Sequence, residues 1–494
     1  MGPNWRTPSP IKRQYGLVTQ LRSLLDHVAN QVATYRENVG EARVFPDADL
    51  EATRAAFGGP LPEEPSPARQ VVDALIAAAE PALVSTTGPR YFGFVVGGAL
   101  DAATAADILA TGWDQPAYNH LSSPSAALAE EAAGEWLKEL LGLPAGASFG
   151  FVTGGQAANT VGLAAARHYV LAKAGWDVEQ RGLAGAPAVR VVASEERHAT
   201  IDRALRLLGL GAGSVRPVAS DRNGAIDIGA LRAALAEGAE AADGAHGADG
   251  GDGAERAEGP TIVCLQAGNV NSGGCDDLVA GITAAHEHGA WVHVDGAFGL
   301  WAAASPARRH LVEGLERADS WACDGHKWLN VPYDSGYVFC AHPEAHVAAM
   351  TFTAAYLVGT SPPPMRVPAD FAPESSRRAR GFATWAALRQ LGRRGVADLV
   401  ERTCALALQF AERLKEMEGV EVVNDVVLNQ VLVRFGGDDS TTQRVIDALQ
   451  RGGECWMGAT TWHGQRLMRI SVSNWSTTEA DVERSVKAIA AALG

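Results

Sequence analysis

The chain has 494 residues, of which 47% are hydrophobic and 20% are charged. This composition is typical of a globular protein that buries a large core, and the length is sufficient for two or three domains. The formal net charge of -15 argues against a nucleic-acid partner, because no basic stretch offsets the acidic residues.

Hydropathy and cysteine usage indicate the cellular compartment of the protein. No run of about eighteen apolar residues occurs, and the first residues, MGPNWRTPSPIKRQYG, lack the apolar stretch of a signal peptide. The six cysteines are scattered, with no CxxC pair and no metal-ligand spacing, which is typical of a reduced chain. We therefore expect a cytoplasmic protein with no membrane segment and no metal site.

Patterns along the chain predict three parts. Residues 1–85 carry helical patterns interrupted by GGPLPEEPSP and show no strong strand signal. Residues 86–360 alternate between strands and helices and form a large domain. Its apolar strand candidates are FGFVT, VRVVAS, TIVCLQAG and AWVHVDGA. Such runs, separated by helices, predict an α/β fold with a mostly parallel central sheet buried on both faces.

One segment of the large domain departs from this pattern. Residues from about 236 to 260 are almost entirely Ala, Gly, Asp and Glu. Because so few apolar groups cannot offset the entropy of ordering, we predict a solvated, flexible insertion between a helix and a strand.

Residues 361–494 are predicted to hold a lid and a small C-terminal domain. The proline-rich span GTSPPPMRVPADFAPESS is longer than a simple connector, and loops of that length in compact enzymes are often lids. A long helix is expected from about Ala379. The alternating strand and helix patterns that follow predict a small α+β domain with an open antiparallel sheet.

Four features fall at the carboxyl ends of the predicted parallel strands, where open α/β sheets bind ligands. The first is the small-residue turn TGGQAAN, from Thr153 to Asn159. Free N–H groups at the start of a helix suit a phosphate, although a plain strand-to-helix turn reads the same way. The second is His198 in SEERHAT, which is either a helix cap or a group facing a ligand.

The third feature is Asp295, which ends a strand expected to be buried on both faces, and such a carboxylate needs a partner. That partner is either structural, such as a helix amino terminus, or a cationic nitrogen of a cofactor. The fourth is Lys327 in DSWACDGHKW, with no obvious carboxylate beside it. It is either a surface lysine lying on Trp328 or a covalent lysine. About thirty residues separate the two features, the length of a helix and a returning strand.

The order of these features decides among the alternatives. A phosphate turn, a histidine facing a ring, an aspartate at a strand end and then a lysine form the arrangement that pyridoxal phosphate requires. The phosphate needs N–H donors, the lysine amine forms a Schiff base, and the aspartate keeps the pyridine nitrogen protonated. Lys327 is therefore interpreted as the lysine that binds the cofactor.

The motifs HVDGAFG, SWACDGHKWLNVPYDSG and ESSRRARGFATWAALRQLG resemble the group II pyridoxal-phosphate-dependent decarboxylases, the family of glutamate and aromatic-L-amino-acid decarboxylases. The resemblance implies a fold-type-I PLP-dependent transferase fold and a homodimer with active sites at the subunit interface. It also implies that Lys327 forms the Schiff base, that Asp295 pairs with the pyridine nitrogen and that Ala297 packs under the ring. His198 would stack on the other face of the ring. The implied phosphate ligands are Gly155, Gln156, Ala157 and His326.

The chain also departs from that family. Ala157 replaces a common serine or threonine, and Asn269 in AGNVNSGG stands near a usual Gly-Thr-Thr turn, where it is expected to supply a comparable contact. Asp324 replaces an asparagine that often meets the phosphate, and we expect its carboxylate to point elsewhere. No tyrosine occurs between Tyr356 and Trp385, where aromatic-amino-acid decarboxylases carry a proton-donating tyrosine.

The functional prediction is decarboxylation of an L-amino acid, aromatic or bulky apolar, to the amine and CO2. The alternatives are oxygen-dependent formation of an aldehyde, suggested by Phe371 near the place of the missing tyrosine, and aminotransfer on the same scaffold. His198 or Asp370 is an alternative proton donor. Phe94, Val95 and Trp301 are candidates for an apolar substrate pocket or for the core.

Overall fold

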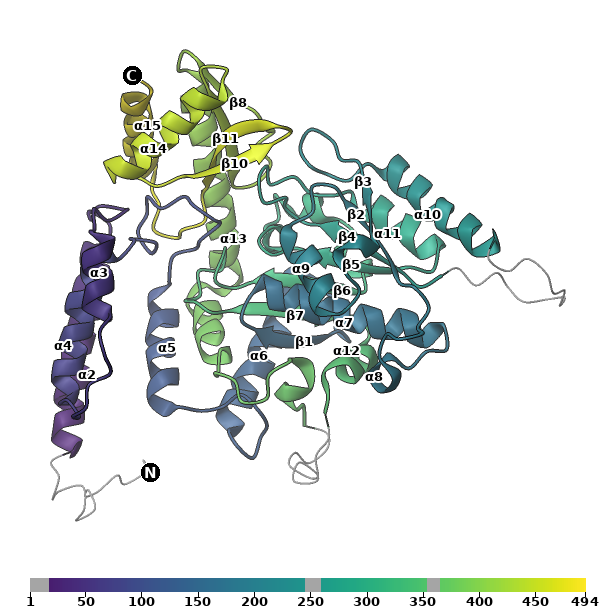
Figure 1. The fold of residues 1–494 in the computed structure, drawn as a ribbon, viewed down its shortest axis with the longest axis horizontal. Coiled ribbons are helices and arrows are strands. Elements are labelled where there is room, and N and C mark those ends of the chain that lie inside the picture. Colours follow the sequence, from purple (N-terminus) through teal and green to yellow (C-terminus); the bar gives the residue numbers. More distant parts are fainter. Residues whose placement is uncertain (1–16, 245–258, 353–364) are drawn as a thin grey trace.

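The computed structural model describes residues 17–244, 259–352 and 365–494 (Figure 1). They form an N-terminal helical arm, a large α/β domain and a small domain that holds the C-terminus. None of the helices in these ranges is long and apolar enough to cross a membrane.

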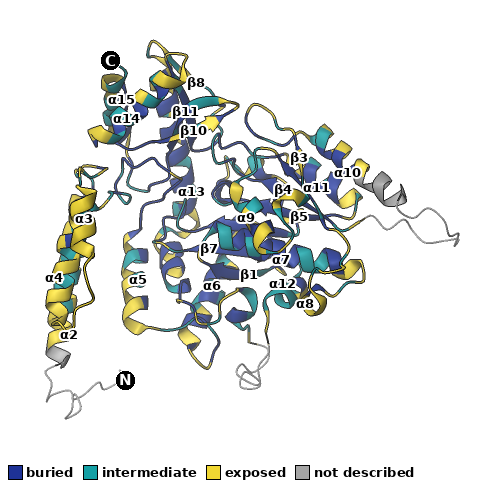
Figure 2. Cartoon of the chain, in the orientation of Figure 1, coloured by how far each residue is buried: buried dark blue, intermediate teal, exposed yellow. Residues whose placement is uncertain are grey.

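The arm, residues 17–79, confirms the predicted helical character of this part of the chain. Its helices are α2 (Leu17–Asn38), α3 (Leu50–Phe57) and α4 (Ala68–Ala79). Helix α3 begins where the Asp49 side chain accepts hydrogen bonds from the backbone N–H groups of Glu51 and Ala52. The arm stands beside the body of the molecule, and most of its surface is exposed (Figure 2).

The large domain is built on a seven-stranded sheet in the order β1-β7-β6-β5-β4-β2-β3. The strands are β1 (Ser148–Val152), β2 (Arg190–Ser194), β3 (Val215–Val218), β4 (Thr261–Gln266), β5 (Trp291–Asp295), β6 (Ser320–Asp324) and β7 (Gly336–Cys340). All neighbours pair in parallel from β3 across to β6, and only β7 runs antiparallel to its neighbours β1 and β6. The predicted α/β fold with a mostly parallel sheet is confirmed.

Helices cover both faces of this sheet. They are α5 (Asp101–Trp113), α6 (Pro124–Leu141), α7 (Gly155–Lys173), α8 (Val178–Arg181), α9 (Ala199–Leu207), α10 (Ile228–Gly244), α11 (Leu278–Glu287) and α12 (Pro343–Met350). Alternate residues of β4 face opposite sides: Val263 and Leu265 pack with Ile282 of α11, whereas Ile262 and Cys264 pack on the side of α7 and α9. Burial on both faces explains why the strand is a continuous apolar run.

The connection between β5 and β6 differs from the predicted single helix. It consists of three short 3-10 helices, η3 (Gly299–Ala304), η4 (Arg309–Val312) and η5 (Leu315–Arg317). The Trp301 side chain on η3 is fully buried, and its indole N–H donates to the backbone oxygen of Asp324 at 3.0 Å. Trp301 is therefore a core residue that supports the end of β6.

Helix α13 (Gly381–Lys415) joins the two domains, which moves the predicted boundary at residue 361. Its buried residues up to Cys404 belong to the core of the large domain, and those from Leu406 to Leu414 belong to the core of the small one. At Gly392 a φ of 61° interrupts the helix. Before α13, the described part of the predicted lid holds only the short helix η7 (Pro368–Phe371), and residues 353–364 lie outside the described ranges.

The small domain confirms the predicted antiparallel sheet. Its four strands follow the order β10-β11-β9-β8 and pair antiparallel throughout. They are β8 (Val420–Val422), β9 (Gln430–Phe435), β10 (Gly458–Trp462) and β11 (Gln465–Ser471). Helix α14 (Asp439–Gly452) packs on this sheet, and α15 (Glu479–Leu493) packs against α14 and α13.

The insertion predicted at about 236–260 is partly helical. Helix α10 continues through Gly244, so the first third of that segment extends the preceding helix. Alanine is the strongest helix former, and the run AEGAEAA is rich enough in it to continue a helix already begun. Residues 245–258 lie outside the described ranges.

Asn330 connects the turn that follows β6 to distant parts of the chain. This buried residue adopts a φ of 58°, a conformation that asparagine tolerates better than most residues. Its side-chain oxygen accepts from the N–H of Gly98 at 2.6 Å and of Trp475 at 2.9 Å. Its side-chain nitrogen donates to the oxygens of Trp328 and Ser473. Segments from both ends of the chain are thereby fixed around Lys327.

Candidate active site

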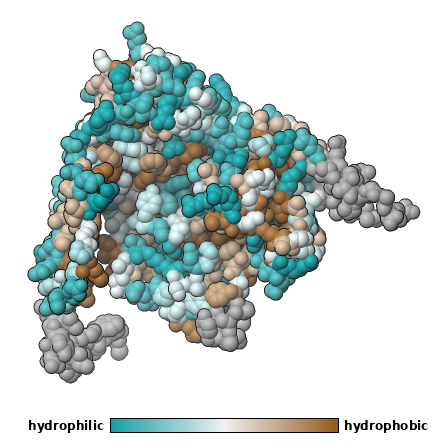
Figure 3. Space-filling view, viewed as in Figure 1, coloured by the Kyte–Doolittle hydropathy of each residue, from teal (hydrophilic) through white to brown (hydrophobic). Residues whose placement is uncertain are grey.

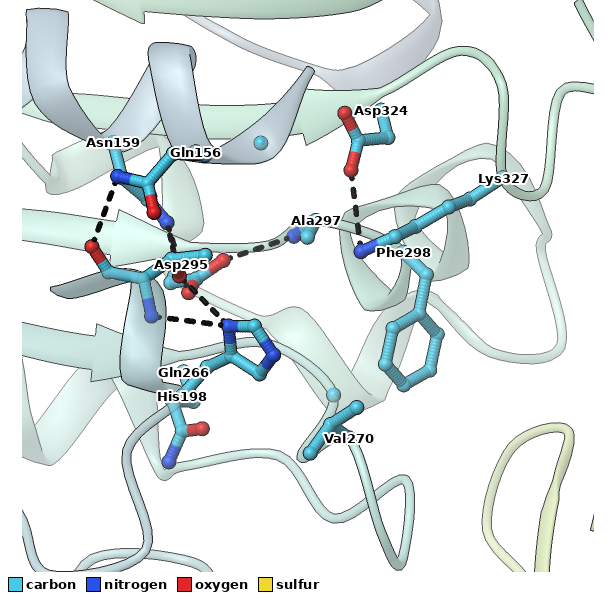
Figure 4. A pocket seen from close by; sticks show the side chains of 13 residues that line it. Gln156, Asn159, His198, Gln266, Val270, Asp295, Ala297, Phe298, Asp324 and Lys327 are labelled. Carbon is cyan, nitrogen blue, oxygen red and sulfur yellow. Dashed lines mark hydrogen bonds and ion pairs between the residues drawn. The ribbon is translucent and has the colours of Figure 1, made fainter. Parts of the chain in front are cut away.

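A pocket lies at the carboxyl ends of β4, β5 and β6, against the amino end of α7 (Figure 4). Its lining consists of Gly155, Gln156, Asn159, His198, Thr200, Gln266, Gly268, Val270, Asp295, Ala297, Phe298, Asp324 and Lys327. Most of the residues predicted from the sequence are among them. Ala157, Asn269 and His326 are predicted site residues that do not line this pocket.

The predicted phosphate turn has the required backbone geometry. Helix α7 begins at Gly155, and its first backbone hydrogen bond runs from the N–H of Ala158 to the oxygen of Gly154. The N–H groups of Gly155, Gln156 and Ala157 therefore have no partner within the helix and form the positive end of its dipole. The Ala157 side chain packs with an apolar cluster, so this residue can contribute only through its backbone.

Glycine is required in this turn because other groups approach closely. A Cβ atom on Gly154 would lie 2.8 Å from Cε1 of His326, and one on Gly155 would lie 2.9 Å from Oδ2 of Asp324. Side chains at these positions would fill the space in front of the helix end. The turn therefore leaves room for an anion next to His326.

Lys327 has a carboxylate partner that the sequence interpretation did not identify. Its Nζ lies 3.2 Å from Oδ2 of Asp324, three residues earlier, and only 2% of the Asp324 side chain is exposed. Asp324 therefore points into the pocket, and the expectation that it points elsewhere is wrong. The turn after β6 brings the two side chains back to the same side of the sheet edge, and the attraction between them offsets the cost of burying the carboxylate.

His326 lies beside the phosphate turn. Its Nδ1 accepts from the N–H of Ser335 at 3.1 Å, so the neutral ring carries its proton on Nε2, which lies 3.6 Å from Oδ1 of Asp324. Burial lowers the pKa of His326. Its ring also stacks on Tyr333, with 4.4 Å between the ring centres. His326 is therefore close enough to this end of the pocket to meet a bound phosphate, although it does not line the cavity.

Asp295 ends β5 with both carboxylate oxygens engaged. Oδ2 accepts from Nδ2 of Asn159 at 3.1 Å and Oδ1 accepts from the N–H of Ala297 at 3.3 Å. Only 6% of the residue is exposed. The partner that burial demands is thus an amide from α7, and the remaining lone pairs of the carboxylate are available to a ligand in the pocket.

The structure places His198 both at a helix cap and in the lining of the pocket. It is the N-cap of α9, where its Nδ1 accepts from the N–H of Thr200 at 3.3 Å and lies 2.8 Å from the Thr200 hydroxyl oxygen. It also lines the pocket (Figure 4). Burial lowers its pKa, and the nearby Asp295 opposes that shift. Because Nδ1 is an acceptor, the neutral ring carries its proton on Nε2.

Asn269, which was predicted to supply a cofactor contact, does not line this pocket. Its Nδ2 donates to the oxygen of Glu196 at 3.0 Å, and its Oδ1 accepts from the N–H of Asn271 at 2.9 Å. Both ends of the fully buried amide therefore stabilise the turn itself, while its neighbours Gly268 and Val270 reach the pocket.

Three functional candidates escaped the sequence interpretation. Asn159 and Thr200 line the pocket, and the only sequence signals for them are a polar residue within an apolar helix and the H-x-T spacing after His198. The third is Arg469 on β11, whose Nη1 donates to the oxygen of Val270 at 3.0 Å. Burial lowers the pKa of Arg469 to about 10. Among the described residues no carboxylate lies within ion-pair distance of it, and its charge acts on His198.

The residues predicted to contact the substrate differ in exposure in the structure. Phe94 is 64% exposed and stacks on Trp456, whereas Val95 is buried. Both have positive φ angles, 53° and 57°, a strained conformation that is rare for a β-branched residue and is often found at functional sites. The next residues pass over the lysine turn, where the N–H of Gly97 donates to the oxygen of His326 at 3.4 Å.

Phe371 does not lie in this pocket. Its ring packs edge-on against His346 at 5.2 Å and under the Arg366 guanidinium at 4.4 Å, and its backbone oxygen accepts from Nε2 of His346. Asp370 likewise does not line the pocket, and burial raises its pKa. Within the chain described here, neither residue reaches the groups around Lys327.

The pocket fits pyridoxal phosphate. At one end lie a lysine amine and a helix terminus with free N–H groups; at the other lie an aspartate held by hydrogen bonds and a histidine (Figure 4). The buried Oδ1 of Asp324, at the lysine end, makes no hydrogen bond with any described residue. These features define a pyridoxal-phosphate-binding α/β protein.

Comparisons with known proteins identify the family. The profile of the pyridoxal-dependent decarboxylase conserved domain matches residues 52–435. Tryptophan decarboxylase 1 of Oryza sativa subsp. japonica is 25% identical over 92% of this chain and 90% of its own length. Phenylacetaldehyde synthase of Arabidopsis thaliana is 22% identical over 95% of each chain. The crystal structure of Oryza sativa TDC with PLP and tryptamine has a TM-score of 0.87 at 23% identity and covers 99% of both chains.

The chain therefore belongs to the pyridoxal-dependent decarboxylases. It is an enzyme, its cofactor is pyridoxal phosphate and its fold is that of the fold-type-I PLP-dependent enzymes. The predicted family, cofactor and fold are confirmed.

Proposed function

We propose that the protein removes CO2 from the α-carbon of an L-amino acid with an aromatic or bulky apolar side chain and releases the amine. The observation that carries this proposal is the arrangement of Lys327, in the turn after β6, and Asp295, at the end of β5, around one pocket. Val270 and Phe298 supply apolar side chains to the lining of the same pocket.

When bound, pyridoxal phosphate supplies an electron-accepting ring that stabilises the negative charge left on the substrate carbon as CO2 departs. In this chain Lys327 would hold the cofactor covalently, and the Asp295 carboxylate would hold a proton on its ring nitrogen. His198 would cover one ring face and Ala297 the other. The N–H groups of Gly155, Gln156 and Ala157, together with His326, would hold the phosphate.

Arg469 is the group that we assign to the carboxylate of the substrate. It is a desolvated cation without a carboxylate partner among the described residues, and it lies against Val270 near His198. A planar guanidinium binds a carboxylate through two parallel hydrogen bonds. The Nε2–H of His198 is a second donor beside it.

Aromatic side chains in the segment 91–97 favour a substrate with an apolar side chain. Tyr91 and Phe94 both stack on Trp456, with ring centres 5.0 and 5.3 Å apart. This cluster adjoins the segment that crosses the lysine turn, so it provides an apolar surface near the cofactor. Relatives of the chain include tryptophan and tyrosine decarboxylases, which supports the same class of substrate.

The aldehyde-forming reaction is the second candidate. Two observations favour it: no tyrosine occurs between Tyr356 and Trp385, and one relative is a phenylacetaldehyde synthase. We place the amine first because decarboxylases predominate among the relatives.

We further propose a homodimer in the cytoplasm. The arm presents exposed apolar side chains, and Figure 3 shows hydrophobic patches along it. These side chains are Leu21, Leu25, Leu50, Phe57, Val71 and Leu75. A second copy of the chain would bury this surface. All six cysteines are unpaired, which agrees with a reducing compartment.

The test is incubation of the cofactor-loaded protein with each of the twenty L-amino acids, scoring amine, aldehyde, CO2, oxo acid and peroxide, with oxygen uptake followed by an electrode. We expect amine and CO2 in equal amounts from aromatic or bulky aliphatic substrates, without oxygen uptake. Lys327→Ala is the control. Aldehyde with peroxide would replace our proposal by the second candidate, and oxo acid without CO2 would establish aminotransfer.

A further inference from the structure

Asp295 and His198 are joined by one residue, Asn159 on α7. Its Nδ2 donates to Oδ2 of Asp295 at 3.1 Å and to the hydroxyl of Thr200 at 3.0 Å, and that hydroxyl lies 2.8 Å from Nδ1 of His198. Asn159 is fully buried. Figure 4 shows it above Asp295 on the side away from Lys327.

The other end of the Asn159 amide is held from the core. Its Oδ1 lies 2.9 Å from Nε2 of His293 on β5, and Nδ1 of His293 lies 2.8 Å from the hydroxyl of Ser320 on β6. The indole N–H of Trp291 donates to that hydroxyl at 2.9 Å. These groups are buried beneath the pocket. The orientation of Asn159 is thus fixed by two strands of the sheet.

The proton positions in this chain of hydrogen bonds follow from its two ends. The Asp295 carboxylate can only accept, so Asn159 turns its amide nitrogen toward it and its Oδ1 toward Nε2 of His293, which must donate. Nδ1 of His293 is then an acceptor, so the Ser320 hydroxyl donates to it and accepts from the Trp291 indole. Burial lowers the pKa of His293 to about 4, so its ring is neutral and its single hydrogen lies on Nε2. That hydrogen points to Oδ1 of Asn159.

We propose that Asn159 is a positioning residue for Asp295: its amide nitrogen, oriented from the core through His293, keeps the carboxylate directed into the pocket. A donor hydrogen bond stabilises the charged form of a carboxylate and opposes the cost of its burial. This inference rests on the proposed function, because it assigns Asp295 to the ring nitrogen of the cofactor.

A buried asparagine that only supports the fold would leave the ligand preference of the pocket unchanged when it is replaced. Replacement of a residue that orients Asp295 would change that ligand preference. The distinguishing property is the ability of the pocket to recognise the ring nitrogen, which is measured by binding without any substrate.

The experiment titrates cofactor-free protein with pyridoxal phosphate and with an analogue in which carbon replaces the pyridine nitrogen. We expect the wild-type protein to prefer pyridoxal phosphate by about tenfold or more, the scale of a charge-assisted hydrogen bond. In Asn159→Asp a second carboxylate faces Asp295, the two share a proton, and the preference should disappear. In Asn159→Ser, whose hydroxyl is too short to reach Asp295, it should disappear as well.

Asn429→Asp is the matched control. Asn429 is equally buried but lies in the small domain, where its amide nitrogen donates to the oxygen of Val472. This variant should keep the wild-type preference. An Asn159 variant that folds and keeps the preference would overturn the inference, and so would a wild-type protein that binds both compounds equally. If Asn159→Asp does not fold, Asn159→Ser decides. Failure of the wild-type protein to bind pyridoxal phosphate at all would instead overturn the proposed function.

Discussion

The two ends of the cofactor pocket are built differently. At the ring end, Asp295, Asn159 and His198 have no buried polar atom without a partner among the described residues. At the phosphate end, Oδ2 of Asp324 forms an ion pair with Lys327. The other oxygen, Oδ1, is buried and makes no hydrogen bond with any described residue. Asp295 and His198 are thus held by hydrogen bonds within the protein, although the buried Nε2 of Gln266 beside them has no partner among the described residues. The phosphate end instead gathers charges whose balance depends on what binds there.

This difference has an energetic consequence. A network with every partner present holds its geometry whether or not a ligand is bound, which is the condition for preorganised catalysis. The interaction energy of an ion pair beside a helix terminus changes with each charge that is added nearby. Substitution of Asp295 should therefore act mainly on the rate of reaction, and substitution of Asp324 should act mainly on cofactor affinity and stability.

The largest effect is expected from Lys327→Ala. Turnover should fall below detection, and borohydride reduction should no longer fix the cofactor to the chain. The variant also leaves the Asp324 carboxylate buried without its partner. The free energy of unfolding of the cofactor-free protein should therefore drop by about 3 kcal/mol. Urea unfolding measures this, and the double variant Lys327→Ala/Asp324→Asn should recover most of the loss. Equal stability of the single and double variants would contradict the ion pair.

Asp295→Asn addresses the ring end. An amide can replace the shape of the carboxylate but not its charge, so the fold and the melting temperature should be retained while kcat falls by about 10³-fold. Circular dichroism and steady-state kinetics provide the two readouts. Near-normal turnover in this variant would show that the aspartate is structural and that the two ends do not differ in the way described.

Asp324→Asn should strengthen cofactor binding at the phosphate end. The carboxylate lies next to the turn that would hold a phosphate, and removing a like charge from such a site should tighten the affinity for pyridoxal phosphate by about tenfold. Because repulsion between charges is screened by salt, the gain should shrink as ionic strength rises. Titration of cofactor-free protein at two salt concentrations measures both effects. Weaker binding in the variant would mean that the carboxylate serves the phosphate directly.

The smallest effect concerns Asp319, just before the other end of β6. Although burial would raise its pKa, hydrogen bonds from His286, His342 and the N–H of Val292 lower the pKa of Asp319 below its ordinary value. A lowered pKa stabilises the folded state above the ordinary value of about 3.9 for aspartate, and this stability is lost as the pH falls below it. Asp319→Asn should therefore show a smaller loss of melting temperature between pH 5 and about pH 3. Parallel acid profiles for both proteins would contradict this.

The sequence predicted much of this site because its chemistry depends on residue type and strand order. Lys327 and Asp295 could be identified because a lysine and an aspartate that follow parallel strands must meet at one edge of the sheet. Asn159 and Thr200 could not, since their roles depend on which atoms face each other across α7, α9 and β5. Asn269 was predicted at the cofactor but does not line the pocket, because its amide makes hydrogen bonds to the backbone of its own turn and of Glu196.

The same limit applies to the fold. Periodicity predicted the strands β1, β2, β4 and β5, where apolar runs are bounded by glycine. It did not predict that the connection to β6 consists of 3-10 helices or that α10 extends into the Ala- and Gly-rich segment. Packing of Trp301 stabilises the 3-10 helices, and local helix propensity extends α10. Neither produces a long-range pattern in the sequence.

The connections of Asn330 bear on how the protein is made. Its side chain binds Gly98 on one side and Ser473 and Trp475 on the other, so the turn that carries Lys327 is complete only when residues near both ends of the chain are in place. A ribosome releases the chain from the amino end, and most of the small domain is still missing when Lys327 emerges. The nascent enzyme is thus expected to acquire its cofactor only after synthesis of the final residues, and a transcript cut before residue 473 should yield colourless protein.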